Sequence, residues 1–267
     1  MVIPDSHVHS EFSFDSQTPI EASVVRAIAR GITHITFTDH FEPFVGSPDY
    51  PEYDAEGFFR SIYKAKDKYG EKIEILAGVE VGQAHFFAES IERLLSSYRF
   101  DFVIGSLHYT EGSIDMAFQT YTMANCRSWL EKYFLEAADV AKTGLYDVFG
   151  HINYICRYMH RQKIPLNIHD YDDLAQLVLR QIVARGKGLE INVSTLRCKG
   201  FTSLPPIEII KKYKSMGGEI ITVGSDSHTA ANVGICIKRG ISLAERAGFK
   251  YIATYKDRKP TFHKIEI

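Results

Sequence analysis

The feature that most restricts the fold of this 267-residue chain is a regular alternation of strand-like and helix-like segments. The strand-like segments are short and rich in β-branched residues, and the segments between them carry apolar residues at helical spacing. After a first strand that ends at His7 and His9, strands are predicted over 32–40, 72–82, 101–109, 146–152, 188–194 and 218–228, with helices over 20–30, 55–70, 88–98, 123–143, 170–186, 205–217 and 236–248. Seven strand-then-helix units imply a parallel sheet with helices outside it.

An α/β barrel is the fold that we predict from this pattern, because seven units suggest closure and the length of the chain suits one barrel. An open, doubly wound sheet is the alternative. Residues 1–267 are predicted to form one domain, because the chain has no Pro/Gly/Ser-rich linker, low-complexity segment or repeat. Thr18 and Glu21 are predicted to form a capping box at the first helix, and 251–256 a last short strand.

Charge and composition argue against several classes of protein. The net charge of −2 provides no basic excess to neutralise a nucleic-acid backbone, so no nucleic-acid partner is expected. No apolar run reaches the length of a membrane span, and the N-terminus lacks the features of a signal peptide. The four cysteines are far apart and suit reduced thiols better than a disulfide framework. We therefore expect a cytoplasmic protein without a membrane partner.

Almost every predicted strand ends in residue types that bind metals. The ends are His7-Val8-His9, Thr38-Asp39-His40, Gly78-Val79-Glu80, Gly105-Ser106-Leu107-His108, Phe149-Gly150-His151, Glu190-Ile191-Asn192 and Gly224-Ser225-Asp226-Ser227-His228. In a parallel barrel these ends lie on one face, where the active sites of barrel enzymes are found. A hydrophobic core does not select such residues, so the pattern indicates a metal site on that face.

The number of candidate ligands indicates more than one ion. The nine candidates are His7, His9, Asp15, His40, Glu80, His108, His151, Asp226 and His228. One zinc-like ion takes three or four protein ligands, so nine suit three ions if one carboxylate bridges. Histidine with carboxylate favours zinc, manganese or iron over calcium or magnesium. Structural or surface roles are predicted for His34, His160, His169 and His263, while His85 stays open.

These motifs, in this order over nearly the whole chain, resemble those of the PHP superfamily (polymerase and histidinol phosphatase), specifically its monofunctional histidinol-phosphatase branch. The resemblance implies a distorted (β/α)7 barrel with three divalent metal ions at the C-terminal ends of the strands. It assigns the ions to His7, His9, Glu80 and Asp226; to Glu80, His108 and His151; and to Asp15, His40 and His228. Some relatives carry histidine where this chain has Asp15, which changes the charge of the third site. Asp39 is expected to orient a ligand histidine.

The resemblance also implies an activity, the hydrolysis of L-histidinol phosphate to L-histidinol and phosphate in histidine biosynthesis. A metal-bridging hydroxide would attack phosphorus, and Glu80, Asp226 and His228 are the expected catalytic residues.

Four further residues are candidates for binding the substrate. Arg157 and Arg197 follow the fifth and sixth predicted strands, and the planar guanidinium group matches phosphate oxygens. Glu42 and Asn153 follow His40 and His151 by two residues and are expected to contact the rest of the substrate. Ordinary loop roles are the alternative for all four.

Other functions fit parts of the pattern. A relative of the same superfamily could act on a small nucleotide or another phosphate ester, or on a nucleic-acid 3′ end, although the charge disfavours a long nucleic acid. A non-catalytic metal-binding barrel would not need an open site with so many ligands. An amidohydrolase-type barrel usually carries a metal-bridging lysine at a strand end, and no predicted strand end has one.

Overall fold

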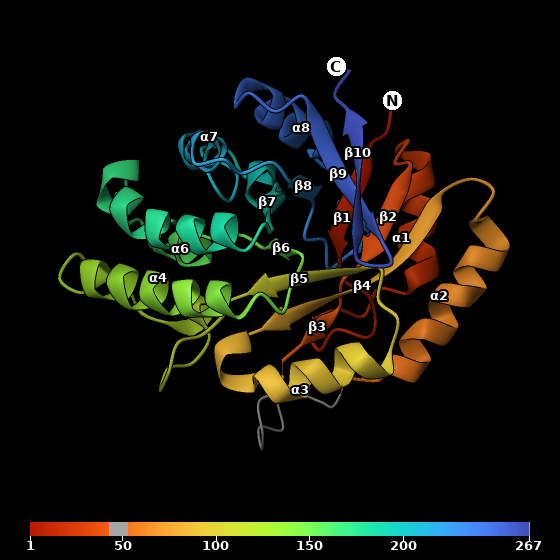
Figure 1. Ribbon diagram of the computed structural model, residues 1–267, viewed down its shortest axis with the longest axis horizontal. Helices are drawn as coiled ribbons and strands as arrows, with labels where there is room; N and C mark the ends of the chain where they lie inside the picture. Colours follow the sequence, from red (N-terminus) through yellow and green to blue (C-terminus); the bar gives the residue numbers. More distant parts are fainter. Residues whose placement is uncertain (43–52, 267) are drawn as a thin grey trace.

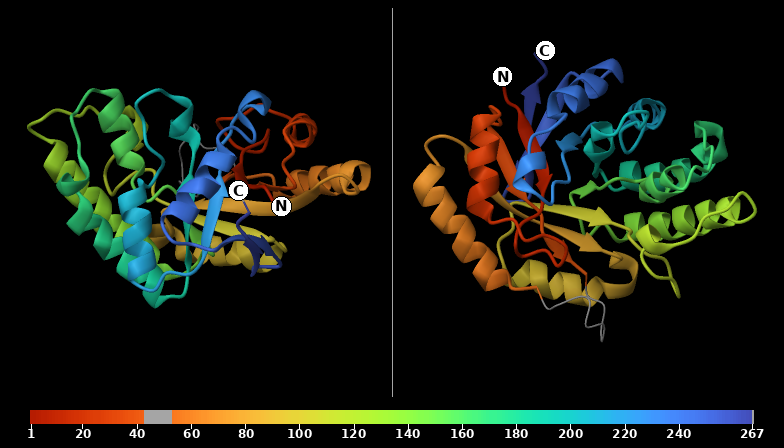
Figure 2. Two further views of the ribbon diagram at one scale, coloured as in Figure 1. Left: turned by 90° about the horizontal axis from the view of Figure 1, so that it is seen from above. Right: turned by 180° about the vertical axis from the view of Figure 1, so that it is seen from behind.

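The computed structural model of the protein describes residues 1–42 and 53–266. A nearly closed barrel of parallel strands lies at its centre, and helices surround the strands (Figures 1 and 2). The barrel strands, in their spatial order, are β1 (Pro4–Val8), β2 (His34–Phe37), β4 (Glu74–Gly82), β5 (Phe102–Ser106), β6 (Val148–Phe149), β7 (Gly188–Asn192) and β8 (Ile221–Gly224). The two-residue strand β3 (His40–Phe41) also pairs with β4. The prediction of a distorted (β/α)7 barrel is confirmed.

The barrel closes where the first strand meets the segment that follows the last one. The backbone N–H of His9 donates to the carbonyl of Ser227 at 2.9 Å, and the N–H of Asp226 donates to the carbonyl of His7 at 2.8 Å. These bonds bring two pairs of candidate ligands, each with one residue between its members, to the same seam.

The helices bury their apolar faces against the strands or against each other. They are α1 (Ile20–Ala29), α2 (Ala55–Tyr69), α3 (Ala84–Ser97), α4 (Cys126–Thr143), α5 (Tyr154–Arg161), α6 (Asp172–Ala184), α7 (Ile207–Ser215) and α8 (Ile237–Arg246). In α6 the buried residues Leu174, Val178 and Ile182 recur every four positions, which places them on one side of the helix. None of the helices in the described residues is long and apolar enough to span a membrane.

Two local predictions differ from the structure, and one helix was not predicted. The predicted capping box of α1 does not form: Glu11 accepts the N–H of Ile20 at 2.7 Å instead. The predicted strand 32–40 is split into β2 and β3. Helix α5 was not predicted, because Tyr, Ile, Cys and His are weak helix formers and the helix has only 8 residues.

The chain continues after the barrel into an antiparallel hairpin. The predicted last strand is β9 (Tyr251–Lys256), and it pairs with β10 (Lys259–Lys264) rather than with the barrel. Arg258, in the turn, forms an ion pair with Asp147, which directly precedes β6. Tyr255 packs on Phe102, the first residue of β5, with ring centroids 4.9 Å apart. The hairpin thus contacts the amino ends of the strands, opposite the face that carries the candidate ligands.

Replacing Tyr255 with alanine is expected to destabilise the protein by about 3 kcal/mol, because it removes an almost fully buried aromatic ring. For a chain of this length the melting temperature should fall by about 10 °C, measured by thermal denaturation. Phe262→Ala is the matched control, because that ring is 48% exposed on the same hairpin. Equal effects of the two substitutions would contradict the anchoring role of Tyr255.

Candidate metal centre

The carboxyl ends of six strands bring the candidate ligands together. His7 lies in β1, His40 in β3 and Glu80 in β4, while His108 and His151 each follow their strand by two residues. Asp226 and His228 follow β8 by two and four residues, and Asp15 lies in the loop after β1. All of them are buried or half-buried except Asp15. The expectation that the strand ends share one face therefore agrees with the geometry.

Glu80 lies at the centre of this cluster. Its Oε2 atom is 3.2 Å from His40 Nδ1 and 3.3 Å from His7 Nε2. Its Oε1 atom is 2.8 Å from His151 Nε2 and 3.3 Å from His108 Nε2. One carboxylate thus faces two sets of imidazoles with its two oxygens, which is the geometry that a bridging ligand needs.

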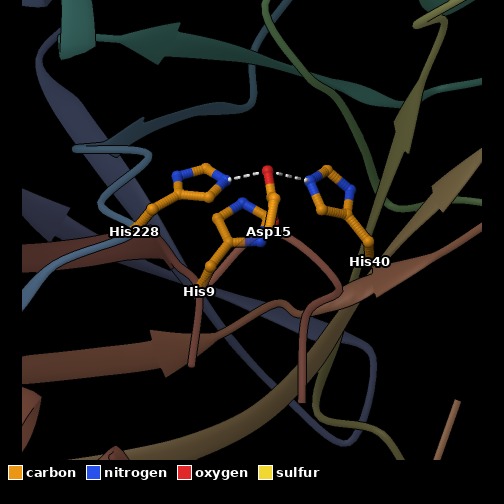
Figure 3. Close-up of side chains that lie close together, drawn as sticks. All are labelled: His9, Asp15, His40 and His228. Carbon is orange, nitrogen blue, oxygen red and sulfur yellow. Dashed lines mark ion pairs between the residues drawn. The ribbon is translucent and has the colours of Figure 1, made fainter. Parts of the chain in front are cut away.

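The nine predicted ligands fall into four overlapping groups, in each of which the donor atoms lie within 4.8 Å of one another. The groups are His9, Asp15, His40 and His228; His7, His9 and Asp226; His7, Glu80 and His151; and His40, Glu80 and His108. Figure 3 shows the first group, in which the Asp15 carboxylate points between the rings of His40 and His228. Asp15 Oδ2 is 2.8 Å from His228 Nε2 and 3.7 Å from His40 Nε2.

The side chains in these groups fit cations. The Nε2 atoms of His7 and His9 lie 3.0 Å apart, so at most one of them can carry the proton between them. The rings of His9 and His228 stack with centroids 4.0 Å apart. Imidazoles crowded in this way, with buried carboxylates between them, have the nitrogen and oxygen donors that zinc and similar ions prefer.

The electrostatics of the cluster favour ionised carboxylates. Burial alone would raise the pKa of Glu80, but His7 and His108 hold that pKa well below its ordinary value. Burial would also raise the pKa of Asp226, but a hydrogen bond with His9 and the charges of His7 and Arg157 keep it well below the usual range. Both groups are therefore available as anionic donors.

Glu190 contacts two of the candidate ligand histidines. Glu190 Oε1 is 2.7 Å from His7 Nδ1, and Glu190 Oε2 accepts the backbone N–H of His151 at 2.8 Å. Such contacts fix the orientation of a ligand imidazole. The sequence reasoning noted that Glu190 ends a strand but gave it no role.

Asp39 acts on its histidines through a serine. It accepts from Ser13 Oγ at 2.8 Å, and Ser13 Oγ is 2.8 Å from His9 Nδ1. Ser13 Oγ also accepts the backbone N–H of His40 at 3.1 Å. Burial raises the pKa of Asp39 to about 6. These contacts agree with the expectation that Asp39 orients a ligand histidine.

Glu42 faces the cluster as well. Its Oε1 atom is 2.6 Å from His108 Nδ1 and 3.7 Å from His40 Nδ1, and its side chain is almost fully buried. Glu42 was predicted from the sequence to bind the substrate, and the contact with His108 already uses one of its two carboxylate oxygens. A role in substrate binding stays a prediction for Glu42.

A cavity of about 250 Å³ opens beside the cluster. Asp15, Asp226 and His228 line it on the side of the candidate ligands, and Arg157, Arg161 and Arg197 also line it. Arg157 and Arg161 lie on α5, whereas Arg197 ends the short 3-10 helix η3 (Ser194–Arg197). Arg161 was not among the residues predicted from the sequence. It lies four residues after Arg157, a spacing that places both on one side of a helix, but this helix was not predicted.

Each of the two predicted arginines has an N–H donor that is not used within the described residues. Arg157 Nε and Arg197 Nη1 are buried and have no hydrogen-bond partner among the described residues. A buried guanidinium N–H without a partner is costly, so both groups suit an anionic ligand.

A second cavity, of about 350 Å³, adjoins the first. Both cavities are lined by Arg157, Thr195 and Phe201. Asn153 and Tyr171 line only the second, and Asn153 Oδ1 is buried without a partner in the described part of the chain. The sequence-predicted Asn153 therefore lies near the arginines but in a different compartment.

The remaining histidines lie outside the four groups. His34 is half-buried with its Nδ1 2.9 Å from Thr33 Oγ1, and His263 Nε2 is 2.8 Å from Thr254 Oγ1. His160 and His169 are exposed. His85 Nε2 lies 3.4 Å from Glu136, and burial lowers the pKa of His85 to about 4.

Comparison with known proteins places the chain in a family. The model of the PHP domain matches residues 5–194. The histidinol-phosphatase of Lactococcus lactis is 31% identical over 273 residues, which cover 98% of each chain. The probable histidinol-phosphatase of Clostridium acetobutylicum is 29% identical and covers 92% of this chain and 94% of its own.

Solved structures of histidinol phosphatases have the same fold as this chain. The crystal structure of histidinol phosphate phosphatase from Lactococcus lactis, complexed with zinc, L-histidinol and phosphate, superimposes with a TM-score of 0.84. It is 28% identical and covers 97% of this chain and 98% of its own. A putative histidinol phosphatase from Listeria monocytogenes shares the fold, with a TM-score of 0.74 at 19% identity, over 88% of this chain and 99% of its own. From its sequence, its barrel and the groups of ligand-type residues at its mouth, the chain belongs to the PHP family.

Proposed function

We propose that this protein is a metal-dependent phosphomonoesterase that hydrolyses L-histidinol phosphate to L-histidinol and phosphate. One observation carries the proposal: the wall of the 250 Å³ cavity combines candidate metal ligands with three arginines. Such a cavity suits a phosphate dianion, which binds cations on one side and guanidinium groups on the other. The relatives named histidinol-phosphatase support the choice of ester.

The proposed cofactors are three divalent ions, which are zinc, manganese or iron. Glu80 is the proposed bridge, and Asp226 and His228 are the proposed catalytic ligands that face the cavity. When bound, the ions would activate a water molecule and neutralise charge on the phosphoryl and leaving oxygens. The related Lactococcus lactis structure contains zinc, which supports zinc as one of the three candidate metals.

The arginines are proposed to bind the phosphate group from the other side of the cavity. Arg157 and Arg197 would donate to phosphoryl oxygens through the N–H groups that lack partners within the described residues. They would hold the phosphorus in front of the candidate ligands and leave the opposite side of the ester free for the departing alcohol.

The leaving group has room in the adjoining cavity of about 350 Å³. Tyr171 and Phe201 would provide its aromatic walls, and Asn153 Oδ1 an acceptor for an N–H group. An aminoalcohol that carries an imidazole suits such a lining.

The deciding experiment measures phosphate release from L-histidinol phosphate by the zinc-, manganese- or iron-loaded protein. A nucleoside monophosphate and an aryl phosphate are assayed beside it. A kcat/KM several hundredfold higher for L-histidinol phosphate is the expected result. Equal rates on all three esters, or a preference for the nucleotide, would overturn this choice of substrate. Metal analysis of the loaded protein is expected to give three ions per chain.

Arg197→Ala is expected to raise the KM for phosphomonoesters about tenfold with little change in kcat, because it removes a charged hydrogen bond to the phosphate group. Steady-state kinetics measure both constants. Arg93→Ala is the matched control, since Arg93 is exposed on α3, away from the cavity. If KM and kcat both stay at their original values, Arg197 does not contact the phosphate.

A further inference from the structure

Asn192, at the end of β7, is fully buried behind the candidate ligands, and its side chain has four hydrogen bonds. Its Nδ2 donates to Asp226 Oδ2 at 3.2 Å and to Glu190 Oε2 at 3.3 Å. Its Oδ1 accepts from Ser194 Oγ at 2.6 Å and from Ser194 N at 3.1 Å. The reverse orientation of the amide would place an oxygen against two carboxylates, so the network fixes the orientation.

Ser194 extends this contact to the arginines. Its Oγ accepts from Arg157 Nη2 at 2.7 Å, and its carbonyl accepts from Arg197 Nε at 2.8 Å. Arg157 Nη2 also donates to Asp226 Oδ2 at 3.0 Å. Arg157, Ser194, Asn192 and Asp226 therefore form a closed ring of hydrogen bonds.

The two carboxylate oxygens of Asp226 face different partners. Oδ2 faces Asn192 and Arg157, whereas Oδ1 faces the imidazoles, 3.5 Å from His9 Nε2 and 3.6 Å from His228 Nδ1. Asp226 also has a φ of 50°, in the left-handed region that a non-glycine residue adopts only when its surroundings hold it there. The contacts to Oδ2 are part of that support.

We propose that Asn192 is a positioning residue that aligns the metal-facing carboxylate of Asp226 with the two phosphate-binding arginines. An amide is the side chain that this place requires, because it must donate to two carboxylates at one end and accept from a serine at the other. The effect on phosphate binding rests on the proposed function. The effect on metal binding rests only on the geometry of the candidate ligands.

The test compares Asn192→Ala, Asn192→Asp and Ser194→Ala, with Thr222→Val as the control. Thr222 is buried in β8 opposite Glu190 and takes no part in the ring. The readouts are zinc affinity of the chelator-stripped protein, the affinity of the zinc-loaded protein for inorganic phosphate, and the melting temperature. Zinc and inorganic phosphate are the probes, so the result does not depend on which ester is the substrate.

Asn192→Ala is expected to weaken both zinc and phosphate binding, each roughly 10- to 100-fold. Ser194→Ala should weaken phosphate binding by about tenfold and leave zinc affinity within about twofold. It removes the hydroxyl that holds Arg157, but it keeps the backbone carbonyl that holds Arg197 and the contact of Asn192 with Asp226. The isosteric Asn192→Asp keeps the volume of the side chain, so it remains informative if the alanine variant does not fold. An aspartate at position 192 cannot donate to Asp226 or Glu190, so this variant is also expected to weaken both zinc and phosphate binding.

A purely structural role predicts another pattern. A lower melting temperature with unchanged zinc and phosphate affinities in the Asn192 variants would overturn the proposal, as would equal effects of Thr222→Val. If wild-type protein binds zinc and phosphate but does not hydrolyse L-histidinol phosphate, the proposed function fails, and the affinities of the variants still decide the role of Asn192.

Discussion

Glu80→Gln is expected to lower kcat on the preferred phosphomonoester about 1000-fold, which corresponds to about 4 kcal/mol of transition-state stabilisation. The substitution preserves the shape of the side chain but removes the charge that faces His7 and His40 through one oxygen and His108 and His151 through the other. A neutral amide cannot bridge two cations with two oxygens. Metal analysis of the purified variant should show fewer ions than the wild-type protein, and steady-state kinetics should show the loss in kcat.

Two comparisons make this result specific. Glu74→Gln changes a glutamate on the same strand that is partly exposed and paired with Lys256, so it should leave activity and metal content unchanged. Asp226→Ala removes a member of one ligand group rather than two, and it is also expected to abolish turnover. Full metal content and a near-normal rate in either Glu80→Gln or Asp226→Ala would refute the metal assignment of that residue.

Removal of the metal ions by a chelator is expected to abolish activity and to lower the melting temperature by about 10 °C. An ion present at 1000 times its dissociation constant stabilises the native state by about 4 kcal/mol, and 1 kcal/mol corresponds to about 2–4 °C in a chain of this size. The physical reason is that the buried carboxylates of Glu80 and Asp226 lose their cations on chelation. Glu80 then keeps only the neighbouring histidines as partners, and Asp226 keeps its histidines, Arg157 and Asn192.

Thermal denaturation before chelation, after it and after addition of zinc measures this effect. Zinc is expected to restore both stability and activity. The Glu80→Gln protein should lose less stability on chelation, because it holds fewer ions at the start. A chelated wild-type protein with an unchanged melting temperature would show that the cluster does not bind ions in the folded protein.

The strand ends were predictable because they follow from periodicity alone. The carboxyl ends of parallel strands share one face of a barrel, so His7, Glu80 and Asp226 could be grouped without any knowledge of their contacts. The order of the strands along the chain also determines which ligands are neighbours, and the structure agrees.

Contacts made from outside the strand pattern were not predictable. Glu42 contacts His108 because β3 pairs with β4, a pairing of two residues that no periodicity reveals. Arg161 depends on α5, whose weak helix formers gave no helical signal. The role of Asn192 depends on side-chain directions within the seam between β7 and β8, which spacing along the chain does not determine.

The closure of the barrel has a consequence for how the protein is made. Asp5 in β1 accepts hydrogen bonds from Ser225, 220 residues later, and the first and last ligand pairs meet at this seam. During synthesis, the early histidines leave the ribosome long before Asp226 exists, and contacts between such distant residues form late in folding. A nascent chain can therefore offer only part of the ligand cluster, and full loading with ions is expected to follow release of the completed barrel.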